Sequence, residues 1–120
     1  MATASDPKPP KYALMKKAAL ALPGTVEVID RHGHWFNIGK KTFALYGMHS
    51  DGKWILRLPK DQVRMLSEAD PDVFSPMIAG ALLWAYVDVT KLNEKELRGY
   101  VTVAWRHLAP KKLQAQLEAE

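Results

Sequence analysis

The stretch from Thr25 to Leu58 alternates apolar and polar residues with a period of two. Successive side chains of a β-strand point to opposite faces of a sheet, so this alternation predicts strands. Four runs carry it: "TVEVIDR", "HWFNI", "KTFALY" and "KWILRL". The turn-forming segments "GKK" at 39–41 and "SDG" at 50–52 separate the last three runs. Because short turns join neighbouring strands in antiparallel order, we predict an antiparallel meander of three or four strands.

Strict alternation also assigns side chains to faces. In "KTFALY" it places Phe43 and Leu45 on one face of the sheet and Ala44 and Tyr46 on the other. One of these pairs is then expected to face the core.

Helical periodicity flanks the meander on both sides. An apolar stripe that begins at Tyr12 and stops at Pro23 predicts a helix ahead of the first strand. A short helix is predicted to open at Pro59. A final helix has the clearest start, because Asn93 is placed as its N-cap and Glu96, three residues later, completes a capping-box pattern.

The segment between the last two predicted helices is less regular. Residues 73–81 fit a loop or a short strand, and residues 82–89 fit a buried strand. The order is therefore helix, three or four strands, helix, one or two strands, helix. This order predicts an α+β fold in two layers, an antiparallel sheet with flanking helices.

The chain has 120 residues, the length of one domain. We expect a flexible N-terminal arm over residues 1–11, because "SDPKPPK" is rich in proline and polar residues. A single domain is expected over residues 12–110. Residues 111–120 are expected to form a C-terminal tail with a helix-like pattern.

Localisation follows from what the sequence lacks. The first residues do not have the basic end and apolar run of a signal peptide, and the longest nearly uncharged stretch, residues 73–87, is shorter than the roughly 20 residues of a membrane helix. The chain has no cysteine, which excludes disulfides and thiolate sites and fits a reducing compartment. We therefore expect a cytoplasmic protein with no membrane association.

Motifs for catalysis and metal binding are weak. His32 and His34 would share one face of a strand, as a metal pair requires, but a third ligand would have to come from His49, Asp30 or Asp51. Solvent-facing hairpin histidines are the favoured interpretation. No serine lies in a nucleophile elbow, and "NIGKKT" has too few glycines for a phosphate loop. We expect no metal, no cofactor and no enzymatic activity.

The net charge of +4 is modest, and its excess lies in the first half of the chain. Long cationic side chains at or near hairpin ends could contact phosphates, while Trp35 or Tyr46 offered a stacking surface. The candidate nucleic-acid-binding residues are Arg31, Lys40, Lys41, Lys53 and Arg57. We favour a structural interpretation over nucleic-acid binding. In the structural interpretation, the tryptophans fill the core and the hairpin lysines protect sheet edges.

An apolar surface is the second functional candidate. The segment "FSPMIAGALLWAYV" could leave Met77, Ile78, Leu82 and Trp84 exposed as anchors for a homodimer or a protein partner. The competing interpretation buries these residues in the domain's own core, and for Leu82 and Trp84 it is the favoured one.

Six segments, in this order and spacing, resemble a known family: "ALALPG" (19–24), "HWFNIGKKTFALYG" (34–47), "DGKWILRLP" (51–59), "ADPDVFSP" (69–76), "LLWAYVDV" (82–89) and "ELRGYVTVAWRHLAPKKL" (96–113). They are similar to the MmcQ/YjbR family over roughly residues 12–113. The resemblance implies a compact α+β fold that has been likened to secretion chaperones and to a double-wing DNA-binding module, with no catalytic residues.

One departure from the family pattern bears on DNA binding. The family often carries basic or histidine side chains just ahead of the last strand, whereas residues 78–83 here read "IAGALL". That wing lacks the usual groups for a phosphate contact. The expected function is weak DNA binding without sequence preference, and the alternative is a protein-interaction module or homodimer that uses the apolar 73–87 segment.

Overall fold

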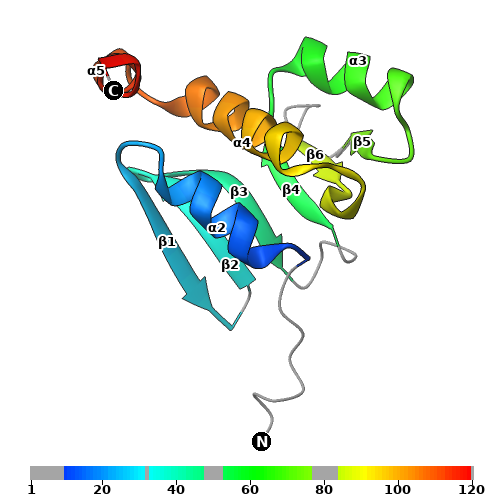
Figure 1. Cartoon of the computed structure of the whole chain (residues 1–120), viewed down its shortest axis with the longest axis horizontal. Coiled ribbons are helices and arrows are strands. Elements are labelled where there is room, and N and C mark those ends of the chain that lie inside the picture. Colours follow the sequence, from blue (N-terminus) through cyan, green and yellow to red (C-terminus); the bar gives the residue numbers. More distant parts are fainter. Residues whose placement is uncertain (1–9, 32, 48–52, 77–83, 120) are drawn as a thin grey trace, which may run out of the picture.

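The computed structural model describes residues 10–31, 33–47, 53–76 and 84–119. Within them, six strands form one antiparallel sheet in the spatial order β1-β2-β3-β4-β6-β5 (Figure 1). The strands are β1 (Thr25–Asp30), β2 (Gly33–Ile38), β3 (Lys41–Gly47), β4 (Trp54–Arg57), β5 (Phe74–Pro76) and β6 (Trp84–Val87). The helices are α2 (Tyr12–Leu20), α3 (Lys60–Ala69), α4 (Glu94–Leu108) and α5 (Lys111–Ala119), with a 3₁₀ turn, η2 (Val89–Lys91). The predicted α+β class and antiparallel sheet are confirmed.

Two helices form the second layer. Helices α2 and α4 pack against each other, and α4 also contacts β3 and β4 while α2 contacts β1 (Figure 1). Helix α3 packs instead against β5 and β6, at the opposite edge of the sheet from β1. The face of the sheet that carries α2 and α4 therefore holds the main core.

A row of residues across the sheet forms the floor of that core. Phe36 pairs with Ala44, Ala44 with Leu56, and Leu56 with Ala85, so the four side chains lie side by side on one face. Each is at most 1% exposed. Burying large apolar side chains such as Phe36 and Leu56 contributes about 1.5–3 kcal/mol each. The row alternates large and small side chains, which lets a helix approach the sheet closely.

A β-bulge breaks the predicted alternation in β3. The β2–β3 register shifts between Phe36 and Asn37, so one extra residue of β3 is accommodated there. Phe43 and Ala44 are both fully buried although they are adjacent, and Leu45 is only half-buried. The expectation that Phe43 and Leu45 share one face and Ala44 the other does not describe the burial, because a period-two rule assumes an uninterrupted ladder.

The start of α4 matches its sequence pattern. The Asn93 side chain accepts a hydrogen bond from the backbone N–H of Glu96 at 2.8 Å, and the Glu96 carboxylate accepts one from the Asn93 N–H at 3.1 Å. This is the predicted capping box. Further along α4, the indole of the fully buried Trp105 donates to the carbonyl of Pro23 at 3.0 Å, which fixes α4 against the turn that follows α2.

The strand predicted over residues 82–89 ends earlier in the structure, at Val87. It spans Trp84–Val87, and Val89 already belongs to η2; Leu82 lies outside the described residues.

None of the helices in the described ranges has both the length and the apolar character needed to cross a membrane.

Candidate nucleic-acid interface

Four of the five cations predicted from the sequence lie at two ends of the sheet. Arg31 follows β1, and Lys53 precedes β4, next to the end of the sheet where Gly33 pairs with Gly47. Lys40 and Lys41 lie at the β2–β3 turn, at the other end of the same strands. A six-residue strand rises about 3.3 Å per residue, so roughly 20 Å separates these ends. The predicted set does not form one contiguous patch.

The β2–β3 turn lies near α5, which is distant from it in the sequence. A β-carbon placed on Gly24 would lie 2.8 Å from the Leu113 side chain and 3.7 Å from that of Ile38. The end of β2, the turn after α2 and the first turns of α5 therefore meet at one point. This contact brings Lys40 and Lys41 to the same end of the molecule as the lysines that open α5.

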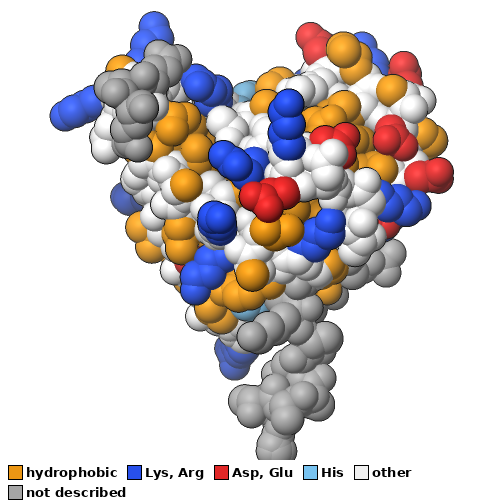
Figure 2. Space-filling view, in the orientation of Figure 1, with side chains coloured by type: hydrophobic (Ala, Val, Ile, Leu, Met, Phe, Trp, Pro, Cys, Tyr) orange, Lys and Arg blue, Asp and Glu red, His pale blue; other side chains and the backbone are white. Residues whose placement is uncertain are grey.

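We call this end of the molecule the basic end. It consists of the exposed side chains of Lys40, Lys41, Arg106, Lys111 and Lys112. In Figure 2, Lys and Arg side chains gather where α5 lies, and most of the visible Asp and Glu side chains lie around α3. On α4 the acidic residues, Glu94 and Glu96, occupy the first turn, roughly 15–18 Å from Arg106 at a rise of about 1.5 Å per residue. Five exposed cations therefore lie at this end of the domain, away from the acidic first turn of α4.

Arg57, the fifth predicted cation, is engaged by a neighbouring aromatic ring. It pairs with Trp84 across β4 and β6, and its guanidinium carbon lies 5.5 Å from the centre of the Trp84 ring, a cation–π distance. Both residues are half-buried. Trp84, a predicted partner-binding anchor, thus contacts Arg57. The other three anchors, Met77, Ile78 and Leu82, lie outside the described residues.

The two aromatic residues proposed as stacking surfaces also have partners within the fold. The indole of Trp35 donates to the Asp30 carboxylate at 3.2 Å, across the β1–β2 hairpin. Tyr46 packs against the buried Trp54, with ring centres 5.6 Å apart. Of the four tryptophans, Trp54 and Trp105 are fully buried, and both are core residues.

A partly buried polar cluster links α2 to the first hairpin, and the sequence analysis did not identify it. The Tyr12 hydroxyl donates to the Glu27 carboxylate at 2.5 Å, Lys16 Nζ lies 3.6 Å from the same carboxylate, and His34 Nδ1 lies 3.8 Å from it. The rings of Tyr12 and His34 meet edge to face, with centres 4.9 Å apart. Burial, together with the bond to the Glu27 carboxylate, raises the pKa of Tyr12 to about 12.

His34 lies within this polar cluster. In the described part of the chain, no three His, Asp or Glu side chains come together in a way that could hold a metal. His34 faces Glu27 instead, and His32 and His49 lie outside the described residues. A tyrosine and a glutamate separated by 15 residues carry no motif, so only the packing of α2 on β1 and β2 reveals their contact.

Comparison with known proteins establishes the family. The YjbR family model matches residues 20–107. The chain belongs to the YjbR family. The crystal structure of Deinococcus radiodurans protein DR2400, described as a DUF419 domain, is similar to this YjbR domain at 18% identity, with a TM-score of 0.66 over 87% of this chain and 85% of that one. No curated protein matches the sequence. The similarity to DR2400 supports the fold.

The segment that matches the family model does not include all of the basic end. Lys40, Lys41 and Arg106 of this YjbR domain lie within residues 20–107, whereas Lys111 and Lys112 lie beyond them. The family match therefore gives no information on the two lysines of α5. Cations at this position also complement the dipole of α4, whose C-terminal end lies at Leu108.

Proposed function

We propose that this YjbR domain is a non-catalytic module that binds double-stranded DNA weakly and without sequence preference through the basic end. The observation that supports the proposal is the contact among Gly24, Ile38 and Leu113, which brings two pairs of lysines to one end of the fold. The described side chains of the β2–β3 turn, of the first turn of α5 and of the last turn of α4 include no Asp or Glu. A surface of this kind attracts polyanions.

The chemistry of the basic end favours phosphates over base edges. Lysine ammonium groups on flexible stems act as point charges, and contacts to phosphates position a duplex without reading its sequence. About four such contacts correspond to a Kd on the order of 10⁻⁴–10⁻⁶ M at physiological salt. Raising the salt from 50 to 200 mM would weaken binding by roughly 100-fold.

Fluorescence anisotropy with a labelled mixed-sequence duplex tests the proposal. Three double variants each remove two positive charges: Lys40→Gln with Lys41→Gln, Lys111→Gln with Lys112→Gln, and, as the matched control, Arg31→Gln with Lys53→Gln at the opposite end of the sheet. The first two are expected to weaken binding by roughly tenfold or more, and the control by much less. Equal loss in all three would assign binding to net charge and would contradict a site at the basic end.

Self-association is a second candidate function, and it rests on β1. This strand forms an edge of the sheet, and its only described strand neighbour is β2. Val26, Val28 and Ile29 are 58%, 40% and 58% exposed. The strand has no lysine, proline or bulge, three of the features that protect an edge, and its charged residues are Glu27, which is bonded to Tyr12, and Asp30 at its end. An antiparallel pair of β1 strands, with Val28 facing Val28 of a second copy, would continue both sheets and cover these side chains.

Sedimentation equilibrium at high protein concentration tests the second candidate. The unaltered chain is expected to show a weak monomer–dimer equilibrium, and Val28→Lys is expected to abolish it by placing like charges opposite each other. Met65→Lys is the control, because Met65 of α3 is 66% exposed and lies far from the β1 edge. A single monomeric species in the unaltered chain would exclude dimerisation through β1.

A further inference from the structure

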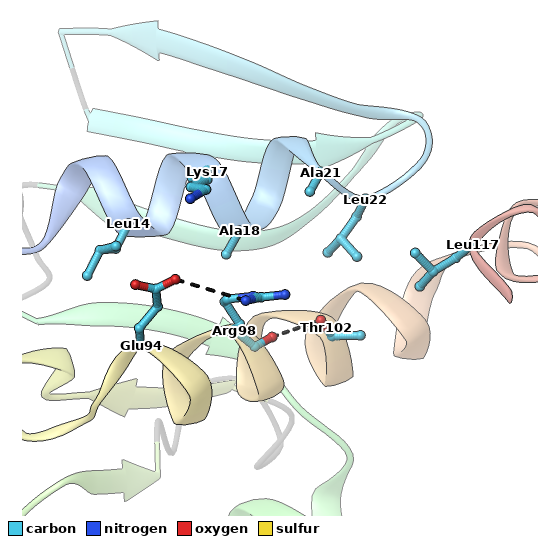
Figure 3. Close-up of a pocket in the computed structure, with 9 residues that line it drawn as sticks. All are labelled: Leu14, Lys17, Ala18, Ala21, Leu22, Glu94, Arg98, Thr102 and Leu117. Atoms are coloured by element: carbon cyan, nitrogen blue, oxygen red, sulfur yellow. Dashed lines mark hydrogen bonds and ion pairs between the residues drawn. The ribbon is translucent and has the colours of Figure 1, made fainter. Parts of the chain in front are cut away.

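A groove lies between α2 and α4, on the outer side of the helical layer. It has a volume of about 260 Å³, and the far end of α5 contributes one wall (Figure 3). On α2 and its C-cap, Leu14, Ala18 and Ala21 recur at spacings of four and three residues, and on α4, Arg98 and Thr102 recur at a spacing of four. Both spacings place side chains on one face of a helix, so the groove is bounded by two facing helical stripes.

The groove exists because the α2 stripe is built from small residues. Figure 3 shows Ala18 and Ala21 directed toward α4, where a longer side chain would reach across the gap. Leu22 and Leu117 point toward each other and close one end. The floor is apolar and well packed, since Ala18 and Leu22 are only 8% and 6% exposed. A ligand could bury a compact apolar body here.

The polar side chains that line the groove are two cations, Lys17 and Arg98, one carboxylate, Glu94, and the Thr102 hydroxyl, so the cations outnumber the carboxylate. Lys17 forms no ion pair with any side chain in the described ranges. Arg98 Nη1 lies 3.9 Å from the Glu94 carboxylate, but these side chains are 65% and 50% exposed, so the pair holds the guanidinium only weakly. The Thr102 hydroxyl donates its proton to the Arg98 carbonyl at 2.8 Å. Unused donor capacity in the groove therefore belongs to Lys17 and Arg98.

We propose that this groove binds a small amphipathic anion. Its carboxylate or sulfonate group would be held by Lys17 and Arg98, and its apolar body would lie against Ala18, Ala21 and Leu22. The volume is slightly below the roughly 300–1,000 Å³ of sites for drug-sized ligands, which limits the ligand to a compact molecule. The inference does not depend on DNA binding, because it uses none of the five cations of the basic end.

Two fluorescent probes of similar shape separate the contributions of charge and apolar contact. 1-Anilinonaphthalene-8-sulfonate carries the anionic group, and N-phenyl-1-naphthylamine lacks it. The full chain is expected to bind the sulfonate saturably with one site, at least tenfold more tightly than the neutral probe. Octanoate is expected to displace the sulfonate, and octanol at the same concentration is not. Absence of saturable sulfonate binding would overturn the proposal.

Substitutions at the groove and away from it test where the probes bind. Lys17→Gln with Arg98→Gln is expected to remove the preference for the sulfonate, lowering its affinity at least tenfold while the neutral probe binds as before. Lys91→Gln with Lys95→Gln removes the same charge from exposed positions that do not line the groove, and both affinities should stay unchanged. Ala21→Leu, at an exposed position, is expected to fill the groove and weaken both probes. Equal effects of the two glutamine pairs, or no effect of Ala21→Leu in a folded variant, would place the probe elsewhere and contradict the proposal.

Discussion

Tyr12 in the first turn of α2 donates a hydrogen bond to Glu27 in the middle of β1, across 2.5 Å. Lys16, one turn further along α2, faces the same carboxylate at 3.6 Å. A partly buried carboxylate is stable only when it is paired or hydrogen-bonded. Glu27 therefore connects the start of the helical layer to the β1 edge of the sheet, where Val26, Val28 and Ile29 provide little packing.

The raised pKa of Tyr12 predicts a loss of stability in strong alkali. Since this pKa rises from 10.0 to about 12 on folding, the folded state holds the phenolic proton more tightly than the unfolded state does. The corresponding stabilisation is complete below pH 10 and is lost as the pH rises from 10 to about 12. Absorbance titration of tyrosinate should show one component near 12 that Tyr12→Phe removes. A Tyr12→Phe spectrum that keeps this component would assign it to another tyrosine.

Gly33 is predicted to be essential to the sheet. Its φ of +149° is unfavourable for other residues, and a β-carbon there would lie 2.2 Å from the backbone oxygen of Tyr46 on β3. Gly33→Ala should therefore lower the free energy of unfolding by at least about 3 kcal/mol. Gly99→Ala is the control, because a β-carbon in the middle of α4 meets nothing within 4 Å and should raise stability by about 0.5–1 kcal/mol. Urea unfolding measures both; comparable stabilities would refute the close approach.

The capping box at the start of α4 should contribute measurably to stability. Asn93→Ala removes the acceptor for the Glu96 N–H and is expected to cost about 1 kcal/mol. Lys95→Ala alters an exposed residue in the same turn that takes no part in the cap, and it should stay within about 0.5 kcal/mol. Thermal unfolding of both variants checks this prediction. An equal change in the two melting temperatures would show that the cap is replaced by water at little cost.

His107 and Arg57 are predicted to be coupled electrostatically. Desolvation of the imidazole lowers the pKa of His107 below 6.5, and the positive charge of Arg57 lowers it further. Because this pKa is depressed in the folded state, the neutral form is favoured, and the associated stability is complete above pH 6.5 and is lost as the pH falls. NMR titration should find a higher pKa for His107 in Arg57→Gln, and no change in Arg31→Gln. An unchanged pKa in Arg57→Gln would exclude the coupling.

Local sequence signals predicted the fold because they act over a few residues. Asn93 and Glu96 predict the start of a helix, and the alternation in "KWILRL" predicts a strand; the structure has α4 and β4 at these places. The predicted sheet with flanking helices is confirmed. The bulge opposite Phe36 could not be predicted, since no glycine or proline marks it and it is set by how β2 and β3 pair. The end of β6 was predicted too late in the chain, because apolar residues such as Val89 also fit a 3₁₀ turn.

The candidate sites were less predictable because they depend on contacts between distant segments. Lys40 and Lys41 were identified from the hairpin turn, but their association with α5 depends on the packing of Leu113 beside Ile38. The groove depends on how α2 crosses α4. No sequence pattern indicates that Lys17 and Arg98, which are 81 residues apart, line the same groove.

The most direct test of the central claim is the salt dependence of DNA affinity, measured from 50 to 200 mM salt. With about four phosphate contacts, the slope of log K against log salt concentration should be roughly −3.6. Lys40→Gln with Lys41→Gln, and Lys111→Gln with Lys112→Gln, should each reduce its magnitude by about 1.8, while Arg31→Gln with Lys53→Gln leaves it unchanged. No saturable binding at 50 mM salt, or the same slope in all four proteins, would contradict DNA binding at the basic end.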